Sequence, residues 1–227
     1  MILKYIEGVR DKYPKSSTFL CGYEAGCLGY SLYHELKNHN VDCKILAPTT
    51  MAITNNRRVK TDKRDAGNIA RCLALKTYSE VYVPSAEDNA IKDFIRMRDD
   101  HMKMLKSTKQ QILAFTLRNG FKFEEGKTYW TLKHMSWLRT LKIDGVFKET
   151  LDEYLVTYEQ LLDRIERLDQ RIEELALGEK YNENVKMLNC FIGIKTHTSL
   201  SFLAEIGDFN RFAKAGNFSS FLGLTTW

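Results

Sequence analysis

Three carboxylates lie at sequence positions that suit metal-dependent phosphodiester chemistry. Glu24 directly follows the apolar run TFLCGY, and ligands and catalytic groups gather at strand ends in α/β sheets. Asp62 and Asp65 are three residues apart at the start of an expected helix, so they share one helical face. Carboxylate oxygens suit Mg²⁺, which offsets phosphate charge and activates the attacking hydroxyl. The acids therefore predict part of a Mg²⁺ site; a purely structural alternative has Asp62 capping the helix and Asp65 in its first turn.

Basic residues surround the two aspartates. The protein has a net charge of only +5, but its positive side chains are bunched, and bunching matters more to a polyanionic partner than the sum does. Such a cluster suits a phosphate backbone, although a basic run can also be a merely solvated face. The predicted nucleic-acid-binding residues here are Arg57, Arg58, Lys60, Lys63 and Arg64.

A further predicted nucleic-acid contact is Lys195. The stretch LNCFIGIKTHTSLSFLAEIGDFNRF indicates a helix, a tight glycine turn, a second helix and another turn at Gly207. This order resembles a helix-hairpin-helix element, whose turn directs backbone N–H groups at a phosphate without reading sequence. The usual second glycine is Lys195 here, which supplies a cation. A plain helix turn is the alternative.

The elements that would position the acids form an α/β unit. Apolar spacing predicts strands at 18–23 and 41–47 with a helix at 30–39 between them, the order of a parallel sheet. A helix at 3–13 precedes them, a helix at 62–76 carries the aspartates, and VYVP at 81–84 closes the unit.

Two long helices follow, at about 90–117 and 151–175, with apolar residues at the spacing of a coiled coil. An antiparallel pair within the chain and a dimer seam are both compatible with this pattern. Between the helices, Trp130, His134 and Trp137 would share one helical face. We interpret them as core around one hydrogen-bonded histidine; a platform for stacking bases is the alternative.

Five cysteines without a CxxC pair are expected to be free thiols. The sequence has no apolar segment of membrane-spanning length, and its first residues carry charge too early for a signal peptide. We therefore predict a cytoplasmic protein without a membrane partner.

Several motifs, taken in order, resemble one family. GYEAGCLGYSLYHEL, ILAP, RRVKTDKRDAGNIARCLA, WTLKHMSWL and FIGIKTHTSLSFLAEIGDFNRF with FLGL are similar to blocks of the DEDD transposases of the insertion-sequence one-ten family. The resemblance implies an α/β plus α architecture. It would comprise an incomplete RuvC-like domain of RNase H fold at 1–86, a helical coiled-coil region at 87–180, and the first part of a C-terminal transposase domain at 181–227.

The family resemblance also implies the chemistry. Four acids bind Mg²⁺ in that family, and the last three match Glu24, Asp62 and Asp65. The first acid belongs to an early strand that we do not find, and the nucleophilic serine follows the FLGL block, so Ser219 and Ser220 are not assigned that role. We therefore expect a fragment truncated at both ends, catalytically incomplete and poorly stable because sheet edges are left unpaired. The implied partners are DNA, a noncoding guide RNA from the same element, and further copies of the chain.

Two other functions stay open. One is a non-catalytic DNA-binding or RNA-binding remnant, whose affinity would fall steeply with salt. The other is a RuvC-like junction nuclease, which needs a fourth carboxylate; Glu7 and Asp11 lie on a helix in the wrong context.

Overall fold

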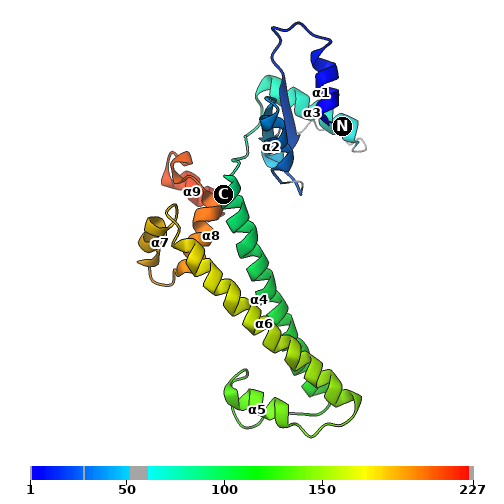
Figure 1. Cartoon of the computed structure of the whole chain (residues 1–227), viewed down its shortest axis with the longest axis vertical. Helices are drawn as coiled ribbons and strands as arrows, with labels where there is room; N and C mark the ends of the chain where they lie inside the picture. Colours follow the sequence, from blue (N-terminus) through cyan, green and yellow to red (C-terminus); the bar gives the residue numbers. More distant parts are fainter. Residues whose placement is uncertain (1, 28, 52–60, 225–227) are drawn as a thin grey trace. The chain divides into compact units, whose positions relative to one another are not determined.

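The computed structural model describes residues 2–27, 29–51 and 61–224. The chain divides into two compact units, Met1–Val83 and Pro84–Trp227 (Figure 1). No helix in the described part of the chain is both long and apolar enough to cross a membrane. The five cysteines are free thiols, as predicted.

The first unit confirms the predicted strand, helix, strand order. Strands β1 (Leu20–Glu24) and β2 (Asp42–Leu46) pair in parallel, with Gly22 opposite Lys44. After the helix α3 (Asp62–Leu75), the chain returns along β2, where the Val81 N–H donates to the Ile45 carbonyl at 2.8 Å. The other elements of this unit are α1 (Ile2–Arg10), α2 (Ser31–Asn38), the 3-10 turn η1 (Pro48–Thr50) and α3 (Asp62–Leu75).

Two faces of this small sheet are covered differently. On one face, Leu36, Val41 and Cys43 form a buried cluster against apolar side chains of α1 and α2. On the other, α3 approaches β1 so closely that a Cβ at Gly22 would lie 2.8 Å from Leu73 Cδ1. Because Gly22 has no side chain, the C-terminal turns of α3 can lie against the strand.

The second unit is built on a helical hairpin. Helices α4 (Ala86–Arg118) and α6 (Val146–Ala176) lie side by side in Figure 1. The end of α4 packs with the start of α6 around Ile112 and Leu151, and the start of α4 packs with the end of α6 around Ile91 and Ile172. The pair is therefore antiparallel and within one chain, the first of the two arrangements that the sequence left open.

The remaining helices of this unit are short. They are α5 (Leu132–Thr140), α7 (Asn182–Asn189), α8 (Thr196–Ile206), the 3-10 turn η2 (Phe209–Arg211) and α9 (Ala215–Phe221). Gly193 and Gly207 have φ of +89° and +67°, so the two predicted glycine turns are confirmed.

A buried carboxylate fixes the start of α4. Ser85 is the N-cap and accepts the Asp88 N–H at 3.1 Å, while its hydroxyl donates to Asp88 Oδ2 at 2.7 Å. The Tyr181 hydroxyl donates to Asp88 Oδ1 at 2.5 Å, and Lys180 Nζ lies 2.7 Å from the same oxygen. Burial by itself would raise the Asp88 pKa, but hydrogen bonds from Lys180, Ser85 and Tyr181 outweigh it and lower that pKa. This network ties the helix start to the segment between α6 and α7.

The aromatic segment differs from its prediction in one respect. Helix α5 begins at Leu132, so Trp130 precedes it and does not share a helical face with His134 and Trp137. The Trp130 backbone has a φ of +65°, which turns its N–H toward His134 Nδ1 at 3.2 Å. His134 is fully buried, as expected of a core histidine, and burial lowers its pKa. Its Nε2 has no hydrogen-bond partner among the described residues, so the ring is satisfied on one side only.

Candidate nucleic-acid interface

The three predicted acids lie on two elements of the first unit. Glu24 is the exposed last residue of β1. Asp62 and Asp65 are in the first turn of α3; Thr61 is its N-cap, so Asp62 lies inside the helix and does not cap it. The capping alternative is therefore wrong in that detail, whereas the placement of both acids in the first turn is confirmed.

The structure does not gather these acids into a metal site. Leu73, near the C-terminal end of α3, packs against Gly22 of β1, and Asp62 lies about 16 Å from Leu73 along the helix axis. Residues 2–27, 29–51 and 61–224 contain no group of three His, Cys, Asp or Glu residues able to hold a metal ion. The described residues therefore give no geometry for a Mg²⁺ site at these acids, and we derive no catalytic step through a metal.

The basic cluster is only partly within the described residues. Arg57, Arg58 and Lys60 lie outside them. Lys63 and Arg64 are exposed on the first turn of α3, beside the two aspartates. The structure thus brings two of the five predicted cations together with two of the three predicted acids at one helix end.

Lys195 occupies the turn between α7 and α8, at the N-cap position of α8, and is exposed. Hydrogen bonds between polar side chains of α7 and α8 support this turn. Ser199, which is fully buried, donates its hydroxyl to Asn189 Oδ1 at 2.7 Å, and Asn189 Nδ2 lies 3.5 Å from Thr196 Oγ1. The two helices flanking the turn are therefore joined by side chains as well as by the backbone.

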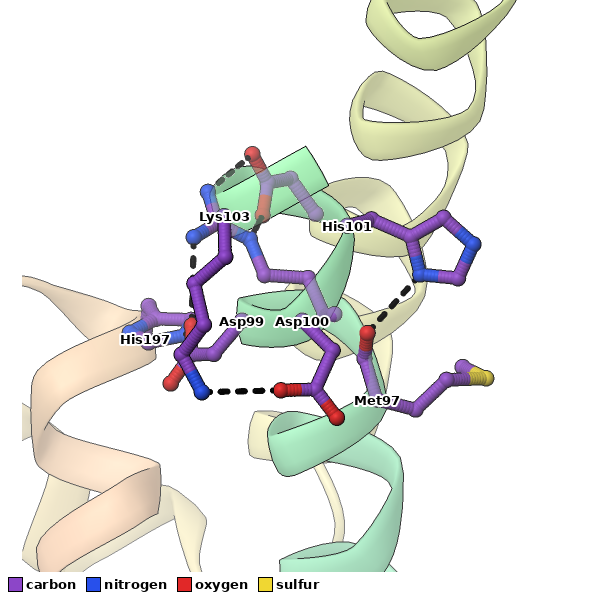
Figure 2. Close-up of polar contacts among 8 residues, drawn as sticks. Met97, Asp99, Asp100, His101, Lys103 and His197 are labelled. Atoms are coloured by element: carbon purple, nitrogen blue, oxygen red, sulfur yellow. Dashed lines mark hydrogen bonds and ion pairs between the residues drawn. The ribbon is translucent and has the colours of Figure 1, made fainter. Parts of the chain in front are cut away.

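Charged residues also fasten α8 to the hairpin. Figure 2 shows His197 of α8 beside Asp99 of α4, where Nε2 and Oδ1 are 3.1 Å apart. Arg98 lies 3.3 Å from Asp99 and holds Asp169 of α6 at 2.6 and 2.9 Å; the hydrogen bond with Asp169 is the main reason that the Arg98 pKa is raised.

Charged residues also connect the C-terminal end of α8 to α4. Glu205 pairs with Lys92 at 3.2 Å and with Arg96 at 2.7 Å. Glu205 is ion-paired with α4 near one end of α8, and His197 lies beside Asp99 near the other, so the helix that follows Lys195 contacts the hairpin at both ends. Sequence reasoning missed these pairs, which join residues about a hundred positions apart; the acidic and basic residues of α4 were the only available signal.

Comparison with known proteins places each of these two regions within a matched family model. Residues 10–121 match a transposase family model, and residues 185–226 match a second one, described as the transposase IS116/IS110/IS902 family. Together the two matches cover more than half of the chain. The first includes Glu24, Asp62 and Asp65, and the second includes Lys195.

Individual relatives carry similar descriptions. The chain is 33% identical over 209 residues to a transposase for insertion sequence element IS1533 from Leptospira borgpetersenii, covering 91% of this chain and 60% of that protein. It is 28% identical to the putative transposase y4qE from Sinorhizobium fredii, over 89% of this chain and 48% of that protein. A transposase for IS1111A from Coxiella burnetii is 25% identical over 73% of this chain and 45% of its own length. The chain thus spans about half to three fifths of these relatives.

Proposed function

Because the chain belongs to the IS116/IS110/IS902 family of transposases, we propose that it acts in DNA transposition by holding duplex DNA. This family is the insertion-sequence one-ten group that the sequence motifs resembled. The observation that carries the proposal is the pair of family matches, one over the acidic and basic α3 region and one over the turn with Lys195. DNA as substrate also implies the cytoplasm as its compartment.

The proposal also includes the metal chemistry that membership of this family implies. A DEDD-type transposase family implies dependence on a divalent metal, and carboxylate ligands favour Mg²⁺ over softer ions. Glu24, Asp62 and Asp65 are the proposed ligands. Bound there, Mg²⁺ would offset phosphate charge during strand cleavage and rejoining. Because no group of three metal ligands is found among the described residues, we propose that the chain by itself binds DNA without cutting it.

This proposal predicts a specific result in a recombination assay. The purified chain would be incubated with Mg²⁺, donor and target DNA and the RNA of the element, and both complexes and strand products would be measured. We expect complexes with DNA but no strand products, because the described part of the chain contains no group of three ligands for one metal ion. Asp62→Ala and the exposed control Asp144→Ala should leave complex formation within about twofold of the wild type, since each changes one surface charge.

Strand products would contradict the binding-only part of this proposal. If they were lost in Asp62→Ala and kept in Asp144→Ala, the chain would assemble its own metal site. Cleavage restricted to four-way junctions would instead favour the junction nuclease. Absence of any complex would remove the proposed function itself.

The other proposed partners rest on the family resemblance. We propose a noncoding guide RNA and a homo-oligomer, for which the same assay with and without RNA, and the mass of the complex in solution, are the corresponding tests. The apolar faces of α4 and α6 pack against each other within one chain, so an oligomer would use other surfaces.

A further inference from the structure

The turn between α7 and α8 exposes two large apolar side chains. Phe191 is 63% exposed and Ile192 is fully exposed, and both lie within the six residues that separate the helices. Met187, one helical turn earlier, is also exposed. Scattered apolar residues on a surface are ordinary, but adjacent ones at the tip of a turn indicate a contact surface.

This exposure is built into the fold. The Phe191 N–H donates to the Leu188 carbonyl at 3.1 Å, and the Ile194 N–H donates back to the Phe191 carbonyl at 3.1 Å. Behind the turn, the Asn189 and Ser199 side chains are hydrogen-bonded, and His197 lies beside Asp99. The turn is therefore held from both sides while its apolar tip is left in solvent.

The charged side chains of the segment that carries the tip are of one sign. Between Glu183 and Glu205 the sequence contains no acidic residue, although the protein as a whole has 29 in 227 residues. The same stretch contains Lys186 and Lys195, both exposed, on either side of the tip. An apolar tip with a cation on either side of it in the sequence complements a ligand with an outer layer of negative charge and an apolar interior. Duplex DNA has this arrangement, with phosphates bordering stacked bases.

We propose that Phe191 and Ile192 form an apolar wedge that enters the minor groove of duplex DNA, with Lys186 and Lys195 on the flanking phosphates. Proteins that bind the minor groove often insert apolar side chains between base steps and partly unstack them. The identity of the ligand, duplex DNA, rests on the proposed function. The wedge specifies in addition which side chains contact the bases, and it predicts that binding distorts the duplex.

The test uses the 227-residue chain and a duplex containing 2-aminopurine, whose fluorescence rises when its neighbours unstack. The wild type should bind and raise this fluorescence. Ile192→Asn should remove the rise and weaken the Kd about tenfold, the scale of losing one contact with a base. The matched control is Leu132→Asn, because Leu132 is 93% exposed on α5, away from the turn, and should leave both readouts unchanged. Since both residues are exposed, both variants should fold, which equal circular-dichroism melting curves would verify.

The phosphate contacts have their own readout. Lys195→Gln should lower the slope of log Kd against log salt by about 1, since one phosphate contact is lost. In contrast, Ile192→Asn should weaken the Kd with the slope unchanged.

The outcomes separate the wedge from the proposed function. If the wild type binds duplex DNA but Ile192→Asn changes neither the Kd nor the fluorescence, the wedge is wrong and DNA binding stands. Equal losses in Leu132→Asn and Ile192→Asn would also overturn the wedge, since they would show a non-local effect. Binding to single-stranded RNA or to anionic vesicles in preference to the duplex would assign the tip to another ligand. No binding to DNA would overturn the wedge and the proposed function together.

Discussion

Leu151→Ala should destabilise the second unit by about 3.5 kcal/mol, because it leaves a cavity where the two long helices meet. Leu151 is fully buried in the cluster that also contains Ile112 and Leu138. The measurement is urea unfolding followed by the fluorescence of Trp130 and Trp137, which pack against this cluster. The expected change is a lower midpoint with an unchanged slope.

The matched control for Leu151→Ala is Val156→Ala on the same helix. Val156 is 45% exposed, so its truncation should change the unfolding free energy by less than about 1 kcal/mol. Similar losses in the two variants would contradict the assignment of Leu151 to the hairpin core.

Asp88→Ala should have the second large effect, a loss of about 3 kcal/mol, because it leaves several donors without their shared acceptor. Tyr181, Lys180 and Ser85 all contact this buried carboxylate, which also fixes the start of α4. Chemical unfolding of the same unit measures the loss. Asp88→Asn, which keeps an acceptor oxygen, should lose less, and Asp93→Ala on the exposed face of α4 should lose less than about 0.5 kcal/mol.

The pH dependence of Asp88 has a definite sign. Because its pKa is lower in the folded protein than in the unfolded chain, it contributes stability above an unfolded pKa of about 3.9. That contribution is lost as the pH falls through the lower folded pKa. The stability difference between wild type and Asp88→Ala should therefore be constant near neutral pH and shrink below about pH 4. A difference that stayed the same at pH 3 would show that the carboxylate charge is not what stabilises the network.

Much of the helical architecture could be predicted because apolar spacing reports it directly. The predicted helix at 90–117 became α4 at Ala86–Arg118, and its earlier start comes from the Ser85 cap, three residues before Asp88. The predicted helix at 151–175 became α6 at Val146–Ala176, which begins after Gly145 in a positive-φ conformation. These ends depend on caps and turns, which periodicity does not contain.

Less of the candidate site could be predicted from the sequence. Spacing correctly placed Asp62 and Asp65 in one helical turn, but it contains nothing about where that helix meets β1. One contact between them is made by Leu73, which is near the opposite end of α3 from the two aspartates and packs against Gly22. Likewise, Asp88 with Tyr181 and Arg98 with Asp169 are tertiary pairs between distant positions, and no local pattern marks either partner.

The measurement that tests the account most directly is the affinity of the 227-residue chain for duplex DNA across a salt series. If the chain is a transposase part that holds DNA through Lys186, Lys195 and the basic residues at 57–64, log Kd should rise with log salt with a slope of at least about 2, set by counterion release from the contacted phosphates. An affinity that does not change with salt, or the absence of binding at low salt, would contradict the account.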